Sequence, residues 1–313
     1  MSVMLQTTPR FFAVLGNRDH IKVDGARRPF HEFLDRQPDG WLSSLVYVGA
    51  TVFPADDRPR MLDCGAWSYK HEPIPVWKRQ PLHSELAVQA YAPYLRLGDF
   101  AIAPDHMLID GVDAEERQAY NLLAAETFLR AAPPTCRPMA VVHGRDVPER
   151  IVMARQFVDL GYQALAIGGI AARAAQPKVI RDIVQSLRQA VPMVWLHVLG
   201  LSSPKYAAWW QAVGIQSFDG SSHFKQAFTA GTFYVHAGAG RLVKHQAGRP
   251  GTDVSHLPVC LCAACDQLRG LGIDTRLYGS NEHNMGRAAH NLNQLMAAHE
   301  AVWAGAPDVW SLS

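Results

Sequence analysis

The feature that most constrains the fold of this chain is an alternation of short apolar runs with longer amphipathic segments. Eight runs rich in apolar and β-branched residues recur, at 11–15, 45–52, 60–63, 99–103, 138–143, 164–168, 193–198 and 215–219. Apolar residues at i, i+3 and i+4 predict helices between the later runs, at 83–97, 114–131, 148–160, 177–190 and 204–213. Strand followed by helix, repeated with eight strands, predicts a (β/α)8 TIM barrel.

Polar residues or glycines follow most of the predicted strands. They are Asp63, Asp105, His143, Gly168, Gly169, His197 and Asp219. A single Asp or Gly after a strand is usually a turn or a helix cap. In a parallel barrel, however, all carboxyl ends of the strands lie on one face, where active sites are built. This series therefore predicts one pocket at that face, although His197 by itself is expected to pack rather than act.

Three of the five cysteines form a C-x-C-x2-C motif, namely Cys260, Cys262 and Cys265. The N-terminus lacks the pattern of a signal peptide, so we expect a cytoplasmic protein with reduced cysteines, which favours a metal over disulfides. His290, near the start of the amphipathic segment 285–303, is the expected fourth ligand, and His283 is the alternative. A Cys3His set leaves no position for water and predicts a structural Zn²⁺. Without a metal, the three would be buried thiols.

The expected organisation is a catalytic barrel over 1–250 and a zinc-binding subdomain with a closing helix over 251–313. No run of 18 apolar residues exists, so no membrane span is expected. The formal charge of +2 neither requires nor excludes nucleic acid, because a local basic groove can hide in a balanced total. The densest basic stretch is RLVKHQAGR at 241–249.

An ordered series of short motifs resembles the tRNA-guanine transglycosylases. The motifs are LDCGAWS at 62–68, FAIAPDHM at 100–107, VVHG at 141–144, AIGGIA at 166–171, VLGLSSP at 198–204 and FDGSS at 218–222. The C-x-C-x2-C loop and His290-Asn291 follow in the order that the family shows. No single motif is specific, but the ordered series with the zinc motif is.

The resemblance implies a role for each matching residue. Asp219 would be the nucleophile and Asp63 the general acid and base. The exchanged base would stack on Trp67 and bind Asp105, with His143 in the place of a base-contacting glutamine. The backbone of Gly168 and Gly169 would complete the base site.

Two departures from the tRNA enzymes point to another branch of the superfamily. After Asp219 the chain continues as GSSHFKQAF, where the tRNA enzymes have an arginine-rich stretch that grips the anticodon loop. The AIGGIA motif is followed by Ala172-Arg173-Ala174, without the glutamate that reads an aminomethyl group. These differences resemble the DNA-modifying, DpdA-type branch, the DNA-guanine transglycosylases. That branch inserts 7-deazaguanine bases, commonly 7-cyano-7-deazaguanine (preQ0), into DNA.

The expected partners are DNA and a 7-deazaguanine base. Phosphate contacts are predicted for Lys225, Arg241, Lys244 and Arg249. The family also implies a homodimer, and accessory DNA-modification proteins are further expected partners. Two alternatives stay open, namely a tRNA-guanine transglycosylase and a non-catalytic paralogue that only binds nucleic acid.

Overall fold

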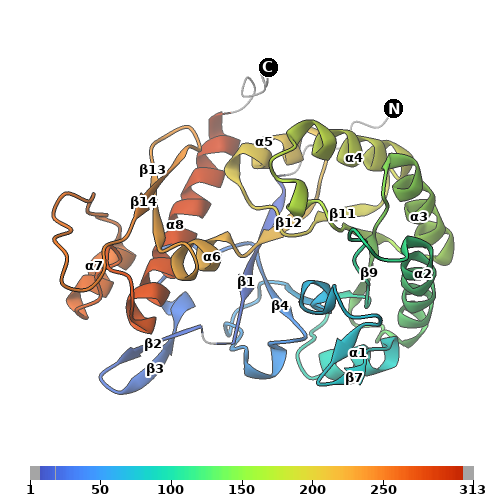
Figure 1. Cartoon of the computed structure of the whole chain (residues 1–313), viewed down its shortest axis with the longest axis horizontal. Helices are drawn as coiled ribbons and strands as arrows, with labels where there is room; N and C mark the ends of the chain where they lie inside the picture. Colours follow the sequence, from blue (N-terminus) through green and yellow to red (C-terminus); the bar gives the residue numbers. More distant parts are fainter. Residues whose placement is uncertain (1–7, 18, 306–313) are drawn as a thin grey trace.

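A closed barrel of eight parallel strands forms the centre of the molecule, as the computed structural model shows for residues 8–17 and 19–305 (Figure 1). Around the barrel the strands follow the order β1, β12, β11, β10, β9, β8, β5, β4. They are β1 (Arg10–Leu15), β4 (Gly40–Ser44), β5 (Arg60–Asp63), β8 (Phe100–Ile102), β9 (Arg137–Val142), β10 (Ala164–Ile167), β11 (Trp195–Val198) and β12 (Ser217–Gly220). The predicted (β/α)8 fold is confirmed.

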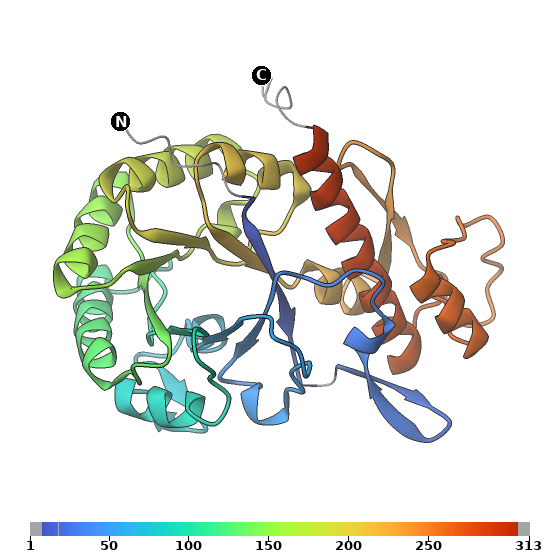
Figure 2. The ribbon, with the colours of Figure 1, turned by 180° about the vertical axis from the view of Figure 1, so that it is seen from behind.

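Helices between the strands cover the outside of the barrel, and Figure 2 shows the same arc from behind. They are α1 (Ser84–Tyr91), α2 (Ala114–Ala131), α3 (Val147–Leu160), α4 (Pro177–Ala190), α5 (Pro204–Ala212) and α6 (Ser222–Phe228). Helices α2 and α4 have the predicted bounds because their starts are well marked. The Asp113 carboxylate caps α2 by accepting from the backbone N–H groups of Glu115 and Glu116, and α4 begins with Pro177.

The second barrel strand was predicted in the wrong place. Instead of residues 45–52, the strand is β4, and part of the predicted run forms the short helix η2 (Val48–Ala50). Composition misled the prediction, because Val46 and Val52 are exposed whereas the less apolar β4 enters the barrel. Gly40 lets β4 approach β1, since a Cβ there would lie 2.4 Å from the ring of Phe12.

The barrel interior is filled by side chains and is not a pore. Phe12, Leu42, Met61, Phe100, Ile102, Met139, Val141, Ala164 and Ala166 form this inner cluster. All of them are buried. Because this layer is packed, any substrate must bind above it, at the carboxyl ends of the strands.

Helix α8 (Asn281–Gly305) takes the place of the helix that β1 lacks. Its His299 ring packs against Phe11 of β1 and Phe218 of β12, with ring centroids 4.9 and 5.2 Å apart. The His299 Nε2–H donates to the Ser202 carbonyl at 2.8 Å. The predicted amphipathic segment 285–303 therefore lies within a helix that closes the outer layer over β1 and β12.

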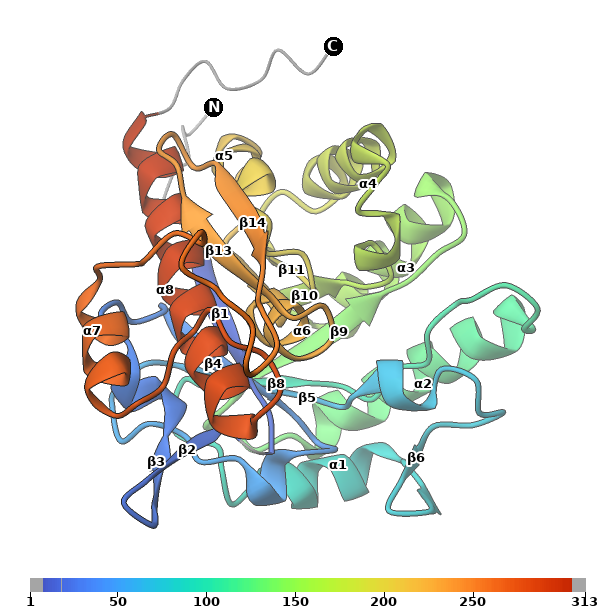
Figure 3. The same ribbon diagram turned by 60° about the vertical axis from the view of Figure 1, so that its left-hand side comes forward.

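Several elements that the sequence did not predict lie outside the barrel sheet. They are the hairpins β2 (His20–Val23) with β3 (Ala26–Pro29), β6 (Val76–Trp77) with β7 (Gln80–Pro81), and β13 (Thr232–His236) with β14 (Leu242–Gln246), the helix α7 (Ala263–Gly270), and the short helices η1 (Phe30–Phe33), η3 (Ala66–Tyr69) and η4 (Ala171–Arg173). The β13–β14 hairpin and α7 lie beside α8 (Figure 3). In the described part of the chain, helices that could span a bilayer are absent.

Candidate active site and metal centre

The carboxyl ends of the barrel strands, called the barrel mouth below, bring the predicted acidic residues together. Asp63 ends β5, Asp105 follows β8 and Asp219 lies in β12. One carboxylate oxygen of Asp63, one of Asp105 and the Cys64 sulfur all lie within 4.8 Å of one another. The charges of both Asp105 and Asp219 act on Asp63. Asp63 and Asp105 thus lie side by side, and Asp219 lies at the same end of the barrel, near enough for its charge to act on Asp63.

Asp63 has the surroundings of a group that exchanges protons near neutral pH. Burial, and then the negative charges of Asp105 and Asp219, raise its pKa to about 7. The Gly65 N–H donates to its Oδ2 at 3.0 Å and opposes that rise. Gly65 has φ +84°, and a Cβ there would lie 2.4 Å from the Ser44 hydroxyl, so only glycine fits this turn. A carboxyl group with such a pKa can act as acid and as base in one cycle.

Asp105 is held by hydrogen bonds to both of its oxygens. The Cys64 thiol donates to Oδ1 at 2.9 Å, and His143 Nε2 lies 2.6 Å from Oδ2. Burial, followed by the charge of Asp105, raises the pKa of Cys64 well above its ordinary value and keeps the thiol protonated. The Tyr69 hydroxyl lies 3.0 Å from both the Cys64 sulfur and the Asp105 carbonyl. Cys64 therefore orients this carboxylate.

Asp219 is buried and is held through one of its two oxygens. Its Oδ1 accepts from the Gly200 N–H at 2.8 Å and lies 3.2 Å from His197 Nε2. Gly200 belongs to the turn after β11, the strand beside β12. The sequence predicted packing for His197 and missed this contact with the carboxylate.

Gly168 and Gly169 lie directly after β10, where their backbone is held by a buried arginine. Arg150 of α3 donates to the carbonyls of Val142 and Gly168, at 3.2 and 2.9 Å. A Cβ on Gly168 would lie 2.5 Å from the His143 ring, which explains the glycine. Sequence reasoning missed Arg150. Its position three residues before Met153, on the buried face of α3, was the available signal.

Trp67 is the exposed aromatic residue of this region, with 63% of its surface accessible. It lies in η3, directly after the turn that holds Asp63. The Lys70 ammonium lies 3.3 Å from its ring centroid, so a cation–π contact orients the indole. An exposed, oriented ring beside Asp63 is compatible with the predicted stacking role, which stays a prediction.

The predicted phosphate-binding cations lie in two places. Lys225 of α6 lines a cavity of about 430 Å³ together with Ser221, and Ser221 follows the strand of Asp219. Arg241, Lys244 and Arg249 are exposed on or after the β13–β14 hairpin. Among the described residues, no carboxylate forms an ion pair with these three cations. They are free to contact a polyanion, and that role also stays a prediction.

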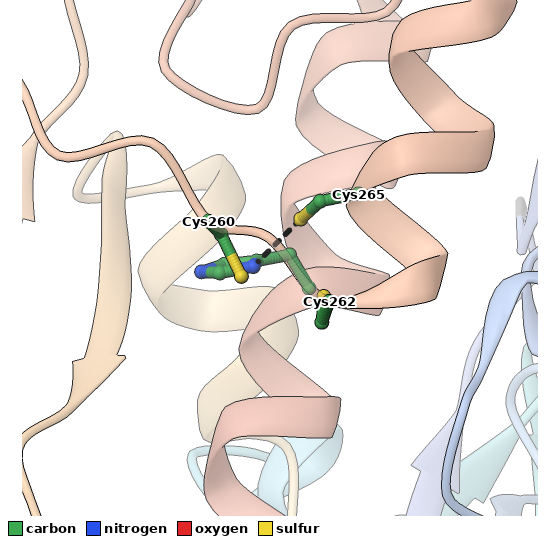
Figure 4. A group of neighbouring side chains, drawn as sticks. Cys260, Cys262 and Cys265 are labelled. Carbon is green, nitrogen blue, oxygen red and sulfur yellow. Dashed lines mark hydrogen bonds between the residues drawn. The ribbon is translucent and has the colours of Figure 1, made fainter.

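The structure brings together Cys260, Cys262, Cys265 and His290, called the Cys3His cluster below (Figure 4). Their ligand atoms lie within 4.8 Å of one another, and His290 Nδ1 is 3.0 Å from the Cys265 sulfur. A zinc ion with Zn–S bonds of about 2.3 Å needs sulfurs about 3.8 Å apart, so the set fits a tetrahedral ion after small shifts.

The second nitrogen of His290 explains which atom would bind the metal. Its Nε2 lies 2.6 Å from the Tyr234 carbonyl, so Nε2 carries the proton and Nδ1 is left facing the sulfurs. The alternative ligand His283 lies outside this group, and its Nδ1 is 2.7 Å from the Ser280 hydroxyl instead. The four residues could therefore hold a metal ion in the way that the sequence predicted.

The barrel, the acidic mouth and the Cys3His cluster are the features on which the resemblance to the guanine transglycosylases rests. Over 203 residues the chain is 23% identical to the DNA-guanine transglycosylase of Salmonella montevideo. The match covers 59% of this chain and 46% of that protein, so the chain spans about half the length of the curated relative that it matches. No family model matches the chain. The predicted resemblance, including that to the DNA-modifying branch, is confirmed.

Proposed function

We propose that this chain is a base-exchange transglycosylase that replaces guanine in DNA with a 7-deazaguanine, with preQ0 as the incoming base. The observation that carries the proposal is the pair of carboxylates Asp63 and Asp219 in one barrel mouth with different surroundings. Asp63 has a pKa of about 7, whereas Asp219 accepts hydrogen bonds through a single oxygen. Two carboxyl groups in unlike environments can divide proton transfer and nucleophilic attack between them.

The chemistry follows from these two roles. Asp219 attacks C1′ of the deoxyribose, the C1′–N9 bond breaks, and a covalent glycosyl ester forms. The departing guanine takes its proton from Asp63. The incoming base then returns a proton to Asp63 and displaces Asp219, which restores the original configuration at C1′.

Base recognition would use the other groups of the mouth. The N1–H and 2-amino groups of guanine are donors that suit the Asp105 carboxylate. Those donors would share or replace the contacts that Asp105 makes with Cys64 and His143. The backbone of Gly168 and Gly169 would approach the base closely, and Trp67 would stack on the nucleotide after it leaves the duplex.

DNA is the polymer that the chain's own features favour. The segment after Asp219 contains no arginine, and Lys225 is its one fixed cation up to Phe228. The matching relative is named a DNA-guanine transglycosylase. Lys225, Arg241, Lys244 and Arg249 would contact phosphates. A tRNA substrate is the second candidate, and the missing arginines count against it. A non-catalytic nucleic-acid-binding protein would not need Asp63, Asp105 and Asp219 together.

The Cys3His cluster would hold a structural Zn²⁺ that ties the loop before α7 to α8. A closed set of four protein ligands leaves no position for a reactive water. We propose the division into a catalytic barrel over 1–250 and a zinc-binding unit over 251–313, although the β13–β14 hairpin already packs on α8. A cytoplasmic location, a homodimer and accessory DNA-modification proteins complete the proposal.

A two-polymer exchange assay tests the function. Purified protein is incubated with preQ0 and either duplex DNA or bulk tRNA, and each polymer is digested to nucleosides for mass spectrometry. We expect a deazaguanine deoxynucleoside from DNA that disappears with Asp219→Asn. The matched control is Asp182→Asn, an exposed aspartate of the outer helix α4. Product in tRNA alone would replace the DNA proposal with the tRNA alternative. Product in neither polymer would favour the non-catalytic protein.

A further inference from the structure

His197 is a fully buried residue that connects the predicted nucleophile to the barrel interior. It faces inward from β11, and its backbone is paired with Ser217 of β12. Its Nδ1 lies 2.8 Å from the Ser217 hydroxyl, and its Nε2 lies 3.2 Å from Asp219 Oδ1. The edge of the His197 ring also packs against Phe12, with centroids 5.9 Å apart. The ring therefore has one position and two polar contacts, one for each nitrogen.

The next residue along this path decides which nitrogen carries the proton. The Trp195 indole N–H, which can only donate, lies 2.8 Å from the Ser217 hydroxyl oxygen. Ser217 thus accepts from Trp195 and has its own proton free to donate to His197 Nδ1, and the Asp219 carboxylate that faces Nε2 favours a proton on that nitrogen. A neutral His197 then has its proton on Nε2 and donates it to Asp219. The opposite tautomer would place a lone pair of Nε2 against the carboxylate.

Two donors then converge on one oxygen of Asp219. The Gly200 N–H and the His197 Nε2–H both point at Oδ1. No described donor has a hydrogen bond to Oδ2. We propose that Oδ2 is the attacking atom, and that His197 is a positioning residue whose tautomer is fixed by the path Trp195–Ser217–His197. This inference rests on the proposed function, because it concerns the same nucleophile.

A neutral donor suits the covalent step better than a cation. When Oδ2 bonds to C1′ and the C1′–N9 electrons leave with guanine, the negative charge of Asp219 is lost. A buried cation beside Asp219 would then be left without its counter-ion, whereas a neutral N–H can still donate to the ester oxygen. His197 would therefore orient Oδ2 for attack without favouring the ionised carboxylate over the ester that it forms.

A double-mutant cycle tests the tautomer path. His197→Gln keeps an N–H donor but has no tautomer to fix, whereas His197→Leu removes the donor. In steady-state exchange on DNA, we expect His197→Leu to lower kcat about 100-fold with little change in the KM for the base, and His197→Gln to restore most of that loss. Ser217→Ala should cost about 10-fold with His197 present and nothing further in the His197→Gln background. An equal cost in both backgrounds would reduce Ser217 to packing and overturn the path.

A spectroscopic measurement keeps the inference testable without any turnover. With ¹⁵N-labelled histidine, the His197 ring signals are assigned by their disappearance in His197→Gln. We expect the neutral form with the proton on Nε2, and a change in this tautomer in Ser217→Ala or, should that variant be unstable, in Trp195→Phe. A proton on Nδ1, or a doubly protonated ring, would refute the inference. Absence of exchange by the unaltered protein would instead count against the proposed function.

Discussion

The barrel mouth and the Cys3His cluster both gather polar groups from distant parts of the chain, but they are held in different ways. In the mouth, the carboxylates of Asp63, Asp105 and Asp219 all accept hydrogen bonds from neighbouring protein groups. In the Cys3His cluster, three sulfurs and one imidazole face each other, and hydrogen bonds from Cys262 and Cys265 lower the pKa of Cys260. A cluster of this kind stays short of a counter-charge until a cation enters it.

This difference predicts where a mutation will act. The mouth is part of a packed barrel, so isosteric changes there should remove chemistry and leave the fold intact. The Cys3His cluster ties α8 to the loop before α7, and that loop has little apolar contact of its own, since Val259 and Leu261 are exposed. Changes there should destabilise the C-terminal region first and affect chemistry only through it.

The largest effect is expected for Asp219→Asn. Base exchange should fall by at least about 10³-fold, because an amide cannot form the glycosyl ester. The melting temperature should hardly change, since the amide oxygen can still accept from the Gly200 N–H. Exchange kinetics and thermal unfolding of the same preparation test both halves. A variant that exchanges bases normally would remove Asp219 from the nucleophile role.

The second prediction concerns stability and uses Cys265→Ser. Loss of one ligand should remove the metal and lower the free energy of unfolding by about 3 kcal/mol or more. Cys136→Ser is the matched control, because Cys136 is a buried thiol far from the cluster in sequence. Metal content by mass spectrometry and unfolding curves measured with and without a chelator provide the readout. Equal metal content and equal stability in both variants would mean that the cluster holds no ion.

The third prediction is a pH dependence that belongs to the mouth alone. Only protonated Asp63 can protonate the departing guanine, so release of labelled guanine in a single turnover should fall above pH about 7. The fall should approach tenfold per pH unit. Asp63→Asn should be slow at every pH and show no such break. A pH profile that is flat between 6 and 9 in the unaltered protein would contradict the acid role.

Asp63 should also make the free energy of unfolding depend on pH, in a direction that follows from its raised pKa. Its pKa rises from 3.8 to about 7 on folding, so the folded state disfavours the ionised form. The unaltered protein should therefore lose stability relative to Asp63→Asn as pH rises from about 4 to about 7, and the difference should then stay constant. The expected difference is on the order of 4 kcal/mol, from about three pKa units at about 1.4 kcal/mol each. Chemical denaturation at several pH values measures it.

The smallest effect is expected on the basic surface outside the mouth. Replacing Lys244 and Arg249 by Gln should weaken DNA binding only a few-fold and reduce the salt slope by about 1 for each phosphate that is no longer neutralised. Arg155→Gln combined with Lys178→Gln, on the outer helices α3 and α4, is the control with the same change of charge. Binding titrations across a range of salt concentrations give the slopes. Slopes that match the control would exclude the β13–β14 hairpin from the DNA site.

Periodicity and local signals in the sequence were enough to predict most of the fold. The bounds of α2 and α4 were predicted from apolar periodicity, and in the structure Asp113 and Pro177 mark their starts. The second strand was missed because Val46 and Val52 have strand-forming side chains but lie exposed in a loop. The position of this strand depends on the close approach of Gly40 to Phe12, which is a contact between strands that cannot be read from composition.

The candidate site divides in the same way. The residues carried by motifs, such as Asp63 and the three cysteines, could be named from their spacing and resemblance. The supporting roles of Arg150, Cys64 and His197 could not be predicted, because they lie in contacts across strands, with the Gly168 carbonyl, Asp105 and Asp219. Such supporting contacts depend on the order of strands around the barrel, which only the closed structure provides.

The long helix α8 has a consequence for the order in which the molecule assembles. Its Asn293 accepts from the backbone N–H groups of Asp35 and Arg36, and its Asn291 accepts from that of Tyr234. The outer face of β1 thus stays uncovered until α8 has been synthesised and has docked. Contacts between residues more than 250 positions apart are slow to form, so the barrel should finish folding only after release of α8 from the ribosome.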